Sequence, residues 1–313
     1  RHPMKITALA GGVGGAKLAN GLSKLLTPDE LSIVVNTGDD FEYSGLYICP
    51  DLDTVTYTLA GISDPINGWG IKDETWNVLS ALRSIGHPVW FKLGDRDLAT
   101  HIERTRLLQS GNSLTEATSI ISNNLGVAHK ILPMTDMPVQ TLIDTVEFGV
   151  MAFQEYFVKH QFNPTLKSIK FAGIDESIMP DAVSKSMNSS DLVIICPSNP
   201  FVSIDPILSV PGIKDILVQK KVVSVSPLIS GKTVKGPAAK IMKEMNLEPN
   251  STNVAKYYGK LLTGFVLDEA DHKETEAIRQ WGIIPLETDI LMTGFEGQVR
   301  LARKVLEFGY SLL

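Results

Sequence analysis

Four aspartates gather in one short stretch that directly follows an apolar, strand-like run: Asp39, Asp40, Asp51 and Asp53. Unpaired carboxylates repel one another and are costly to remove from water, so a packed segment rarely holds four of them without a cation or a bound substrate. A hard cation such as Mg2+ takes one or two carboxylates together with phosphate oxygens. The stretch therefore indicates a divalent metal that carries a phosphorylated ligand, and the alternative is a solvated acidic loop.

A glycine-rich turn at residues 11–15 offers a matching phosphate site, because it follows the strand-like run 5–10 and opens a helical pattern. In such a turn, free backbone N–H groups and the positive end of the helix face an anion. The spacing departs from standard motifs. Lys17 stands where a dinucleotide fingerprint has its third glycine, and the Gly-Lys-Ser/Thr of a P-loop is absent. We expect phosphate binding here, and the alternative is a plain tight turn.

Apolar runs alternate with helical patterns along most of the chain, at residues 5–10, 31–36, 191–196, 221–226 and 262–267. This alternation predicts an α/β fold, a Rossmann-like and mostly parallel sheet with helices on both faces. We expect residues 4–97 and 190–313 to form the nucleotide- or phosphate-binding core. Residues 98–189 are expected to form an inserted, largely helical lobe that could close over the site.

The polar segments that follow these runs should meet in space, because ligands of open α/β sheets collect beyond the carboxyl ends of the strands. The glycine turn and the acidic stretch follow the first and second runs. Ser198 and Asn199 lie in a Pro-flanked turn directly after the run 191–196. The sequence therefore predicts one composite site at a single edge of the sheet.

Two basic segments are further candidates. The run Val89–Lys92 predicts a third strand, and Lys92 at its end could neutralise a phosphate or a ring oxygen. The run Lys232–Pro237 precedes a helix and could also hold phosphate. An edge-strand charge and a solvated loop are the respective alternatives.

Aromatic and histidine side chains near the acidic stretch also have two interpretations. Tyr57 and Trp76 could line a pocket for a flat ring, or they could pack in the core. Asp97 and His101 stand four residues apart and hence on one helix face, where they could relay a proton or form a structural contact.

Composition excludes several classes of protein. The net charge of −6 and a pI near 5.6 argue against a nucleic-acid-binding surface. The two cysteines, Cys49 and Cys196, are too few for a disulfide framework, and neither lies in a zinc-type cluster. No apolar run is long enough to predict a membrane span. We expect a cytoplasmic protein that starts at Met4, with residues 1–3 left over from cloning.

Six short motifs, taken together, closely resemble the 2-phospho-L-lactate transferase (CofD) family. They are Gly11-Gly12-Val13-Gly14-Gly15-Ala16-Lys17, Gly38-Asp39-Asp40, Cys49-Pro50-Asp51-Leu52-Asp53-Thr54, Leu93-Gly94-Asp95-Arg96-Asp97-Leu98-Ala99-Thr100-His101, Phe153-Gln154-Glu155-Tyr156-Phe157-Val158 and Pro197-Ser198-Asn199-Pro200. Each motif alone is weakly specific, but the combination spans nearly the whole chain from Met4. The pattern of apolar segments and the composition resemble those of a methanogenic archaeal member of the family.

The resemblance implies a phosphotransferase of coenzyme F420 biosynthesis. Such an enzyme moves 2-phospho-L-lactate from lactyl-2-diphospho-5'-guanosine to the ribityl hydroxyl of the deazaflavin precursor Fo, and it releases GMP. The resemblance also implies a homodimer that uses Mg2+ as its metal. Its partners are expected to be small-molecule substrates, with no nucleic acid or membrane. The donor could instead be a phosphoenolpyruvyl or related guanosine diphosphate.

The same resemblance, combined with the residue patterns, assigns roles. The metal candidates are Asp39, Asp40 and Asp51, and the catalytic candidates are Asp51, Asp53 and Lys92. Asp53, Lys92, Tyr57 and Trp76 are expected to contact Fo. The guanosine diphosphate part is expected to lie on Gly12, Val13, Gly14, Gly15, Lys17, Ser198 and Asn199. Which aspartate is ligand and which is base stays open.

Two other functions compete with this interpretation. A regulatory nucleotide-sugar-binding protein of the YvcK-like group shares a glycine start and an Asp-Asp loop. Such proteins are expected to carry a Pro-Gly-Asp-Ile-Arg-like element where this chain has residues 49–53, which favours the transferase. An NAD(P) oxidoreductase is the third candidate, and Lys17 in place of the third glycine counts against it.

Overall fold

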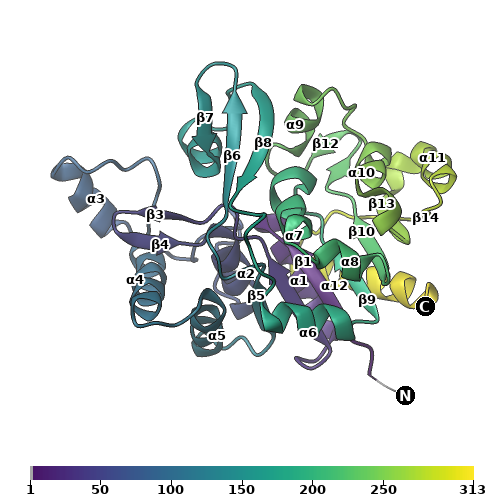
Figure 1. Ribbon diagram of the computed structural model, residues 1–313, viewed down its shortest axis with the longest axis horizontal. Helices are drawn as coiled ribbons and strands as arrows, with labels where there is room; N and C mark the ends of the chain where they lie inside the picture. Colours follow the sequence, from purple (N-terminus) through teal and green to yellow (C-terminus); the bar gives the residue numbers. More distant parts are fainter. Residues whose placement is uncertain (1–2) are drawn as a thin grey trace.

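The computed structural model describes residues 3–313, so most of the expected cloning remnant lies outside the described residues. Its centre is a seven-stranded sheet in the order β14-β13-β10-β9-β1-β2-β5, and every pairing within it is parallel (Figure 1). The strands are β1 (Ile6–Ala10), β2 (Leu31–Val35), β5 (Lys130–Pro133), β9 (Leu192–Ile195), β10 (Lys221–Val225), β13 (Gly264–Asp268) and β14 (Ile284–Thr288). The predicted α/β fold with a mostly parallel sheet is confirmed.

Helices cover both faces of this sheet, and for this reason its central strands β1 and β9 are buried along their whole length and are mostly apolar. In β1, Leu9 packs into one core cluster, whereas Ala8 and Ala10 pack into the cluster on the other face. The helices are α1 (Gly12–Leu25), α2 (Pro50–Ala60), α3 (Asn77–Ser84), α4 (Asp95–Gln109), α5 (Leu114–Asn124), α6 (Asp181–Ser189), α7 (Asp205–Ser209), α8 (Ile213–Leu217), α9 (Ala238–Glu244), α10 (Ser251–Tyr258), α11 (Thr275–Gln280) and α12 (Gly294–Ser311). Shorter helical turns span Glu155–Lys159, Pro200–Ile204, Gly259–Leu261 and Glu269–Glu274.

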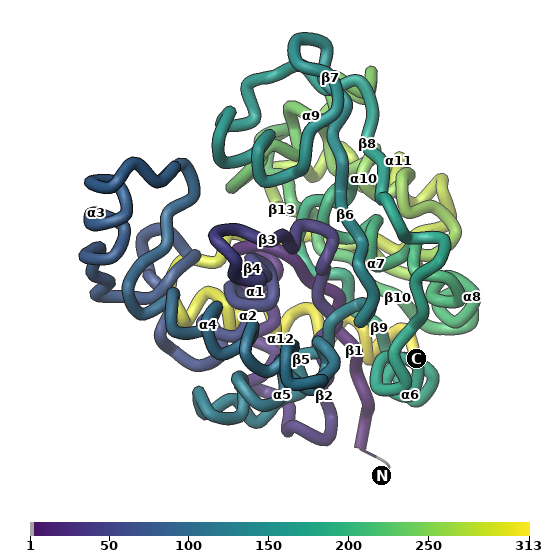
Figure 2. Tube along the Cα trace, turned by 60° about the vertical axis from the view of Figure 1, so that its left-hand side comes forward, coloured from purple at the N-terminus to yellow at the C-terminus, as the bar shows by residue number. Residues whose placement is uncertain are grey.

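Three small antiparallel sheets lie outside the central sheet. They are the hairpin of β3 (Phe41–Tyr43) and β4 (Leu46–Ile48), the sheet of β6 (Gln140–Thr145), β7 (Gly149–Ala152) and β8 (Leu166–Ala172), and the pair β11 (Leu228–Ile229) and β12 (Lys232–Thr233). Figures 1 and 2 show α3 and α4 to one side of the central sheet, and the β6–β7 hairpin projecting beyond it. The segment that contains α3 and α4 follows the carboxyl end of β2, and the sheet of β6, β7 and β8 follows the carboxyl end of β5.

The segment 98–189 is more mixed than the sequence suggests. It contains the edge strand β5 of the central sheet and the whole three-stranded sheet of β6, β7 and β8, besides α5, α6 and most of α4. The strand β5 pairs with β2 from Ser32 to Val35, so this part of the segment belongs to the core sheet. The exact division into a core and an inserted lobe stays a prediction.

One predicted strand is wrong. Residues 89–92 form irregular backbone instead, because Trp90 and Phe91 pack sideways against the rings of Phe41 and Tyr43 on β3 rather than against a neighbouring strand. Local sequence signals end and begin the neighbouring helices. Helix α2 ends at Ala60 and is followed by Gly61, whose φ of 75° is the left-handed conformation that glycine adopts freely. The side chain of Ser113 caps α5 by accepting a hydrogen bond from the backbone of Glu116.

Within residues 3–313, no helix combines the length and the apolar character that crossing a bilayer requires.

Candidate functional site

A cavity of about 620 Å3 opens at the carboxyl ends of β1 and β9. This is the point where the strand order reverses direction, since β1 has β2 on one side and β9 on the other, and open α/β sheets bind ligands at such points. Eight of the predicted site residues line it: Gly12, Val13, Gly14, Lys17, Asp39, Asp51, Ser198 and Asn199. The structure thus brings together the glycine turn, part of the acidic stretch and the Pro-flanked turn.

The glycine turn is packed so tightly that only glycine fits. A Cβ atom on Gly14 would lie 2.6 Å from the carbonyl oxygen of Pro197, and one on Gly15 would lie 2.3 Å from Oγ of Ser198. The Ser198 hydroxyl also accepts a hydrogen bond of 3.0 Å from the backbone N–H of Gly11. Gly15 itself does not line the cavity. The first turn of α1 contains no acidic side chain and no side-chain cap, so its positive end is available to an anion.

Two buried carboxylates line the cavity next to this turn. The side-chain amide of Asn36, at the end of β2, donates to Oδ2 of Asp39 at 3.1 Å and to Oδ2 of Asp51 at 3.0 Å. The second oxygen of Asp39 is buried and has no hydrogen-bond partner within the described chain. Asn36 therefore holds two carboxylates side by side and leaves one oxygen atom free to meet a cation or a ligand.

Burial dominates the electrostatics of this pair. Burial, reinforced by the neighbouring charge of Asp51, raises the pKa of Asp39 well above its usual value. Burial also raises the pKa of Asp51 to about 6, although the hydrogen bonds from Asn36 and from the Gly12 backbone act in the opposite direction. Two carboxylates with raised pKa values and an unpartnered oxygen form a donor set that suits a divalent cation.

The other two aspartates of the stretch do not line the cavity. Both oxygens of Asp40 are buried without a hydrogen-bond partner within residues 3–313, and burial raises its pKa well above the usual value. Asp53 is buried too, but it forms an ion pair with Arg104 of α4, a side chain that is itself only 3% exposed. The predicted four-carboxylate cluster is thus divided between two environments.

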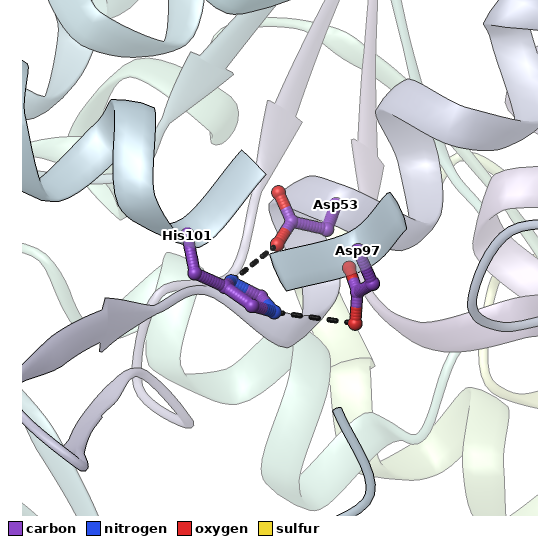
Figure 3. Close-up of side chains that lie close together, drawn as sticks. All are labelled: Asp53, Asp97 and His101. Atoms are coloured by element: carbon purple, nitrogen blue, oxygen red, sulfur yellow. Dashed lines mark ion pairs between the residues drawn. The ribbon is translucent and has the colours of Figure 1, made fainter. Parts of the chain in front are cut away.

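Asp53 belongs to a closed network between α2 and α4 (Figure 3). The ring of His101 lies between two carboxylates, with Nδ1 3.6 Å from Asp53 and Nε2 3.2 Å from Asp97. Asp97 also accepts a 2.6 Å hydrogen bond from the hydroxyl of Tyr57. Burial acts to raise the pKa of Asp97, but its hydrogen bond and charge pairing with His101 outweigh burial and lower it. The predicted contact between Asp97 and His101 is present.

This network also has the spacing of a metal site, since one ligand atom from each of Asp53, Asp97 and His101 lies within 4.8 Å of the others. The guanidinium of Arg104 already neutralises Asp53 and donates at 3.1 Å to the carbonyl of Tyr47. A cation there would meet that fixed positive charge. The chemistry of the donor set therefore favours the Asp39–Asp51 pair for a metal.

The remaining predicted residues lie away from the cavity. Lys92 is exposed on the irregular segment after Phe91. Trp76 is 42% exposed at the start of α3. Tyr57 is 1% exposed, and its hydroxyl faces Asp97. None of the three lines the cavity, and their predicted contacts with Fo stay predictions.

One wall of the cavity was missed by sequence reasoning. The rings of Phe153, Phe157 and Phe162 form a stack with centroid separations of 5.5 and 5.7 Å and interplanar angles of 11° and 22°. The π-helical turn Glu155–Lys159 lies between the first and last of these rings, and Phe162 has a φ of 46°. Both features are uncommon and recur at functional sites. From sequence alone, Phe153 and Phe157 stand out only as part of a family-like motif, and no role was predicted for any of the three rings.

Comparison with known proteins agrees with the motifs. A family model described as 2-phospho-L-lactate transferase CofD matches residues 6–303. The chain is 41% identical over 298 residues to 2-phospho-L-lactate transferase of Methanosarcina acetivorans, with 95% of this chain and 97% of that protein covered. It is 39% identical over 311 residues to phosphoenolpyruvate transferase of Kitasatospora aureofaciens, with 97% of each covered.

A solved structure extends the comparison to the fold. A member of the UPF0052 family from Bacillus halodurans matches with a TM-score of 0.63 at 14% identity, and 98% of this chain and 99% of that chain are covered. At this identity the likeness shows the fold alone. The family match and the relatives, by contrast, extend over nearly all of the sequence. The chain therefore belongs to the 2-phospho-L-lactate transferase (CofD) family.

Proposed function

We propose that this protein transfers the 2-phospho-L-lactate group from lactyl-2-diphospho-5'-guanosine to the ribityl hydroxyl of 7,8-didemethyl-8-hydroxy-5-deazariboflavin (Fo). The oxygen of that hydroxyl forms a bond to the phosphorus that bears lactate, and the bond from this phosphorus to GMP breaks. The products are coenzyme F420-0 and GMP. The names of the Methanosarcina relatives support this reaction.

The observation that carries the proposal is the juxtaposition of a phosphate cradle and two buried carboxylates in one cavity. Gly12 and Gly14 lie on the cavity wall at the start of α1, and Asp39 and Asp51 line the same cavity. Phosphoryl transfer depends mainly on positioning and on neutralising charge. A cavity that combines helix N–H groups with a cation-binding pair meets both requirements.

Asp39 and Asp51 are the residues that would hold Mg2+. The unpartnered oxygen of Asp39 and the raised pKa values of both carboxylates support this fit. When bound, the ion supplies positive charge against the diphosphate. Asp40 lies outside the cavity, so its predicted role as a ligand depends on a change of conformation.

The chain's own groups would do the positioning. The glycine turn would hold the diphosphate through backbone N–H groups, while Ser198 and Asn199 close the other side of the turn. The stacked wall of Phe153, Phe157 and Phe162 would take a flat ring of one substrate. Together these groups exclude water from the reacting phosphorus.

The proton of the attacking hydroxyl needs an acceptor, and Asp51 is the candidate that lines the cavity. Burial raises the pKa of Asp51 to about 6 before a cation binds, so Asp51 would serve as the base only where Asp39 alone holds the ion. Asp53 lies two residues further on and is held by Arg104. We propose that Asp53 orients a hydroxyl of Fo only if its second oxygen, which accepts no hydrogen bond within the described chain, becomes accessible.

The test is an assay of GMP release by the purified protein with Fo, the lactyl donor and Mg2+. We expect turnover that EDTA abolishes and that Asp51→Asn reduces strongly. Asp175→Asn is the matched control, because Asp175 is an exposed aspartate that does not line the cavity. A phosphoenolpyruvyl donor should be run in parallel, since relatives such as that of Kitasatospora aureofaciens are named phosphoenolpyruvate transferase.

Each arm of the assay has its own consequence. Turnover with the phosphoenolpyruvyl donor alone would change the proposed donor but keep the reaction class. Absence of Fo binding, together with tight binding of a UDP-sugar, would contradict the transferase and favour the regulatory alternative. Sedimentation of the same preparation tests the expected homodimer.

A further inference from the structure

One side-chain amide on the cavity wall has no hydrogen-bond partner within residues 3–313. Gln154 lines the cavity and is only 6% exposed. Its side chain does not cap the π-helical turn Glu155–Lys159 that follows it, and neither amide atom is among the polar atoms that are closed off from the surface without a partner. An amide offers two donors and an acceptor, and a side chain so far removed from bulk water normally has partners for them. Gln154 therefore points to a ligand that supplies those partners.

The amide belongs to the same segment as the stacked rings of Phe153, Phe157 and Phe162, the aromatic wall of the cavity. Residues three or four apart face the same side of a helical turn, so Gln154 is a neighbour of Phe157, whose ring stacks on that of Phe153 with centroids 5.5 Å apart. Glu155, the acid of this segment, does not line the cavity. The wall therefore presents aromatic faces beside a neutral amide.

Aromatic faces and a neutral amide suit one kind of ligand. An aromatic face binds a flat ring by stacking, and an amide beside it can bond to the edge of that ring. A lactam edge, on which a ring carbonyl adjoins a ring N–H, is complementary to a primary amide. The amide N–H donates to the ring carbonyl, and the amide carbonyl accepts from the ring N–H. Such a paired contact satisfies a donor and the acceptor of Gln154 together.

We propose that Gln154 selects the ring that stacks on the aromatic wall by pairing with the lactam edge of that ring. Guanine and the deazaflavin ring of Fo both carry such an edge, so the two substrates share this chemistry and only binding measurements distinguish them. The inference rests on the proposed function, because it names the residue that recognises the ring of one of those substrates. It gives a role to a residue of the motif 153–158 that the proposed reaction leaves unassigned.

The segment that carries the amide is held in place from α9. Nζ of Lys240 donates a 2.9 Å hydrogen bond to the carbonyl of Pro164, and Lys240 also pairs with Glu244. Glu244 in turn accepts a 3.2 Å hydrogen bond from the backbone N–H of Leu166. Gln154 is thus presented by a turn that is fixed on its C-terminal side, and a fixed donor and acceptor give up little freedom when a ligand binds.

The experiment measures the affinities of GDP and Fo by calorimetry at fixed Mg2+ concentration, for the unaltered chain and for Gln154→Met. Methionine keeps the length of the side chain and removes both polar groups. We expect one of the two ligands to bind about 5- to 50-fold more weakly, because two neutral hydrogen bonds are lost, and the other to change less than about 2-fold. Gln280→Met is the matched control, since Gln280 is exposed at the end of α11 and does not line the cavity.

Methylated ligands test the same pairing without altering the protein. A methyl group on N1 of guanine or on N3 of the deazaflavin replaces the ring N–H of the lactam edge. For the ligand that Gln154→Met weakens, we expect methylation to weaken binding to the unaltered chain and to have little further effect in the variant. Equal costs of methylation in the two proteins would show that Gln154 does not contact that edge, and would overturn the pairing.

Unchanged affinity for both ligands in Gln154→Met would also overturn the inference, and so would equal losses for both, which a displaced turn would produce. Phe162→Leu should weaken the same ligand as Gln154→Met, and a loss confined to the other ligand would contradict a shared ring site. The proposed reaction is judged separately by GMP release: a ring-selective loss of binding in a protein that does not transfer to Fo would sustain the pairing and reject the reaction.

Discussion

Two charged clusters lie at opposite faces of the same helix, α2, and they differ in how their charges are balanced. On one side, Asp51 lines the cavity with Asp39, whose second oxygen has no hydrogen-bond partner within residues 3–313. On the other side, Asp53 is matched by Arg104, and His101 lies between Asp53 and Asp97. The unbalanced cluster is the one expected to bind ligands, and the balanced one holds α2 against α4.

The two aspartates separate because of helix geometry. Residues two apart on an α-helix point about 200° from each other, so Asp51 and Asp53 cannot face the same partner. Both were assigned to one site from their proximity in sequence. The comparison teaches that carboxylates close together in a chain do not make one site when they lie on a helix.

The largest expected effect comes from breaking the balanced cluster. Arg104→Met would leave Asp53 buried without its counter-charge, and we expect it to lower the free energy of unfolding by about 3–5 kcal/mol. Urea denaturation measures this. Arg106→Met is the control, because Arg106 pairs with Glu103 at the surface, where such a pair contributes at most about 1 kcal/mol. Similar losses in both variants would show that Asp53 is not held by Arg104.

Breaking the unbalanced cluster should spare stability and remove activity. Asp51→Asn keeps the shape of the side chain but removes a charge that lies next to Asp39. We expect GMP release to fall by about 100-fold or more, while the melting temperature at neutral pH stays the same or rises because like-charge repulsion is relieved. In a titration of activity against Mg2+, the concentration that gives half-maximal activity should rise. Full activity in this variant would contradict the assignment of Asp51.

The pH dependence of stability sharpens the same contrast. The pKa of Asp51 is about 6 in the folded protein, above its ordinary value, so burial favours the protonated form. The stability from this group is fully present below about pH 4 and is lost as the pH rises to about 6, by roughly 2–3 kcal/mol. Melting curves from pH 4 to 8 measure it. Added Mg2+ should recover stability at pH 8 but not at pH 4, and Asp51→Asn should flatten the profile.

The smallest effect is expected at the aromatic wall. Phe162→Leu removes one ring from the stack but keeps an apolar side chain, so the affinity for the ligand whose ring binds there should fall about 3- to 10-fold. Titrations with Fo and with GDP identify which ring that is. Phe148→Leu is the control, because Phe148 stacks on His160 and does not line the cavity. Unchanged affinity for both ligands would remove the wall from the binding site.

Much of this protein could be predicted where the information is local. The continuous apolar run in β9 predicts a buried parallel strand, and the glycine turn after β1 predicts the start of a helix; both are present, whereas phosphate binding at that turn stays a prediction. The strand predicted at Val89–Lys92 is absent, because aromatic residues satisfy a strand pattern equally well when they pack against the β3–β4 hairpin. Lys92 therefore could not be placed from its neighbours in sequence.

The sequence by itself determined the α/β class, the family, and which residue types can meet phosphate and metal, because periodicity and turn chemistry act over a few residues. Only the tertiary structure decided which of those residues share a cavity. Asp51 and Asp53 are separated by the turn of a helix, whereas Lys17 and Gln154 are brought to one cavity by the folding of the chain. Such pairings depend on contacts between segments far apart in the chain, and no local pattern records them.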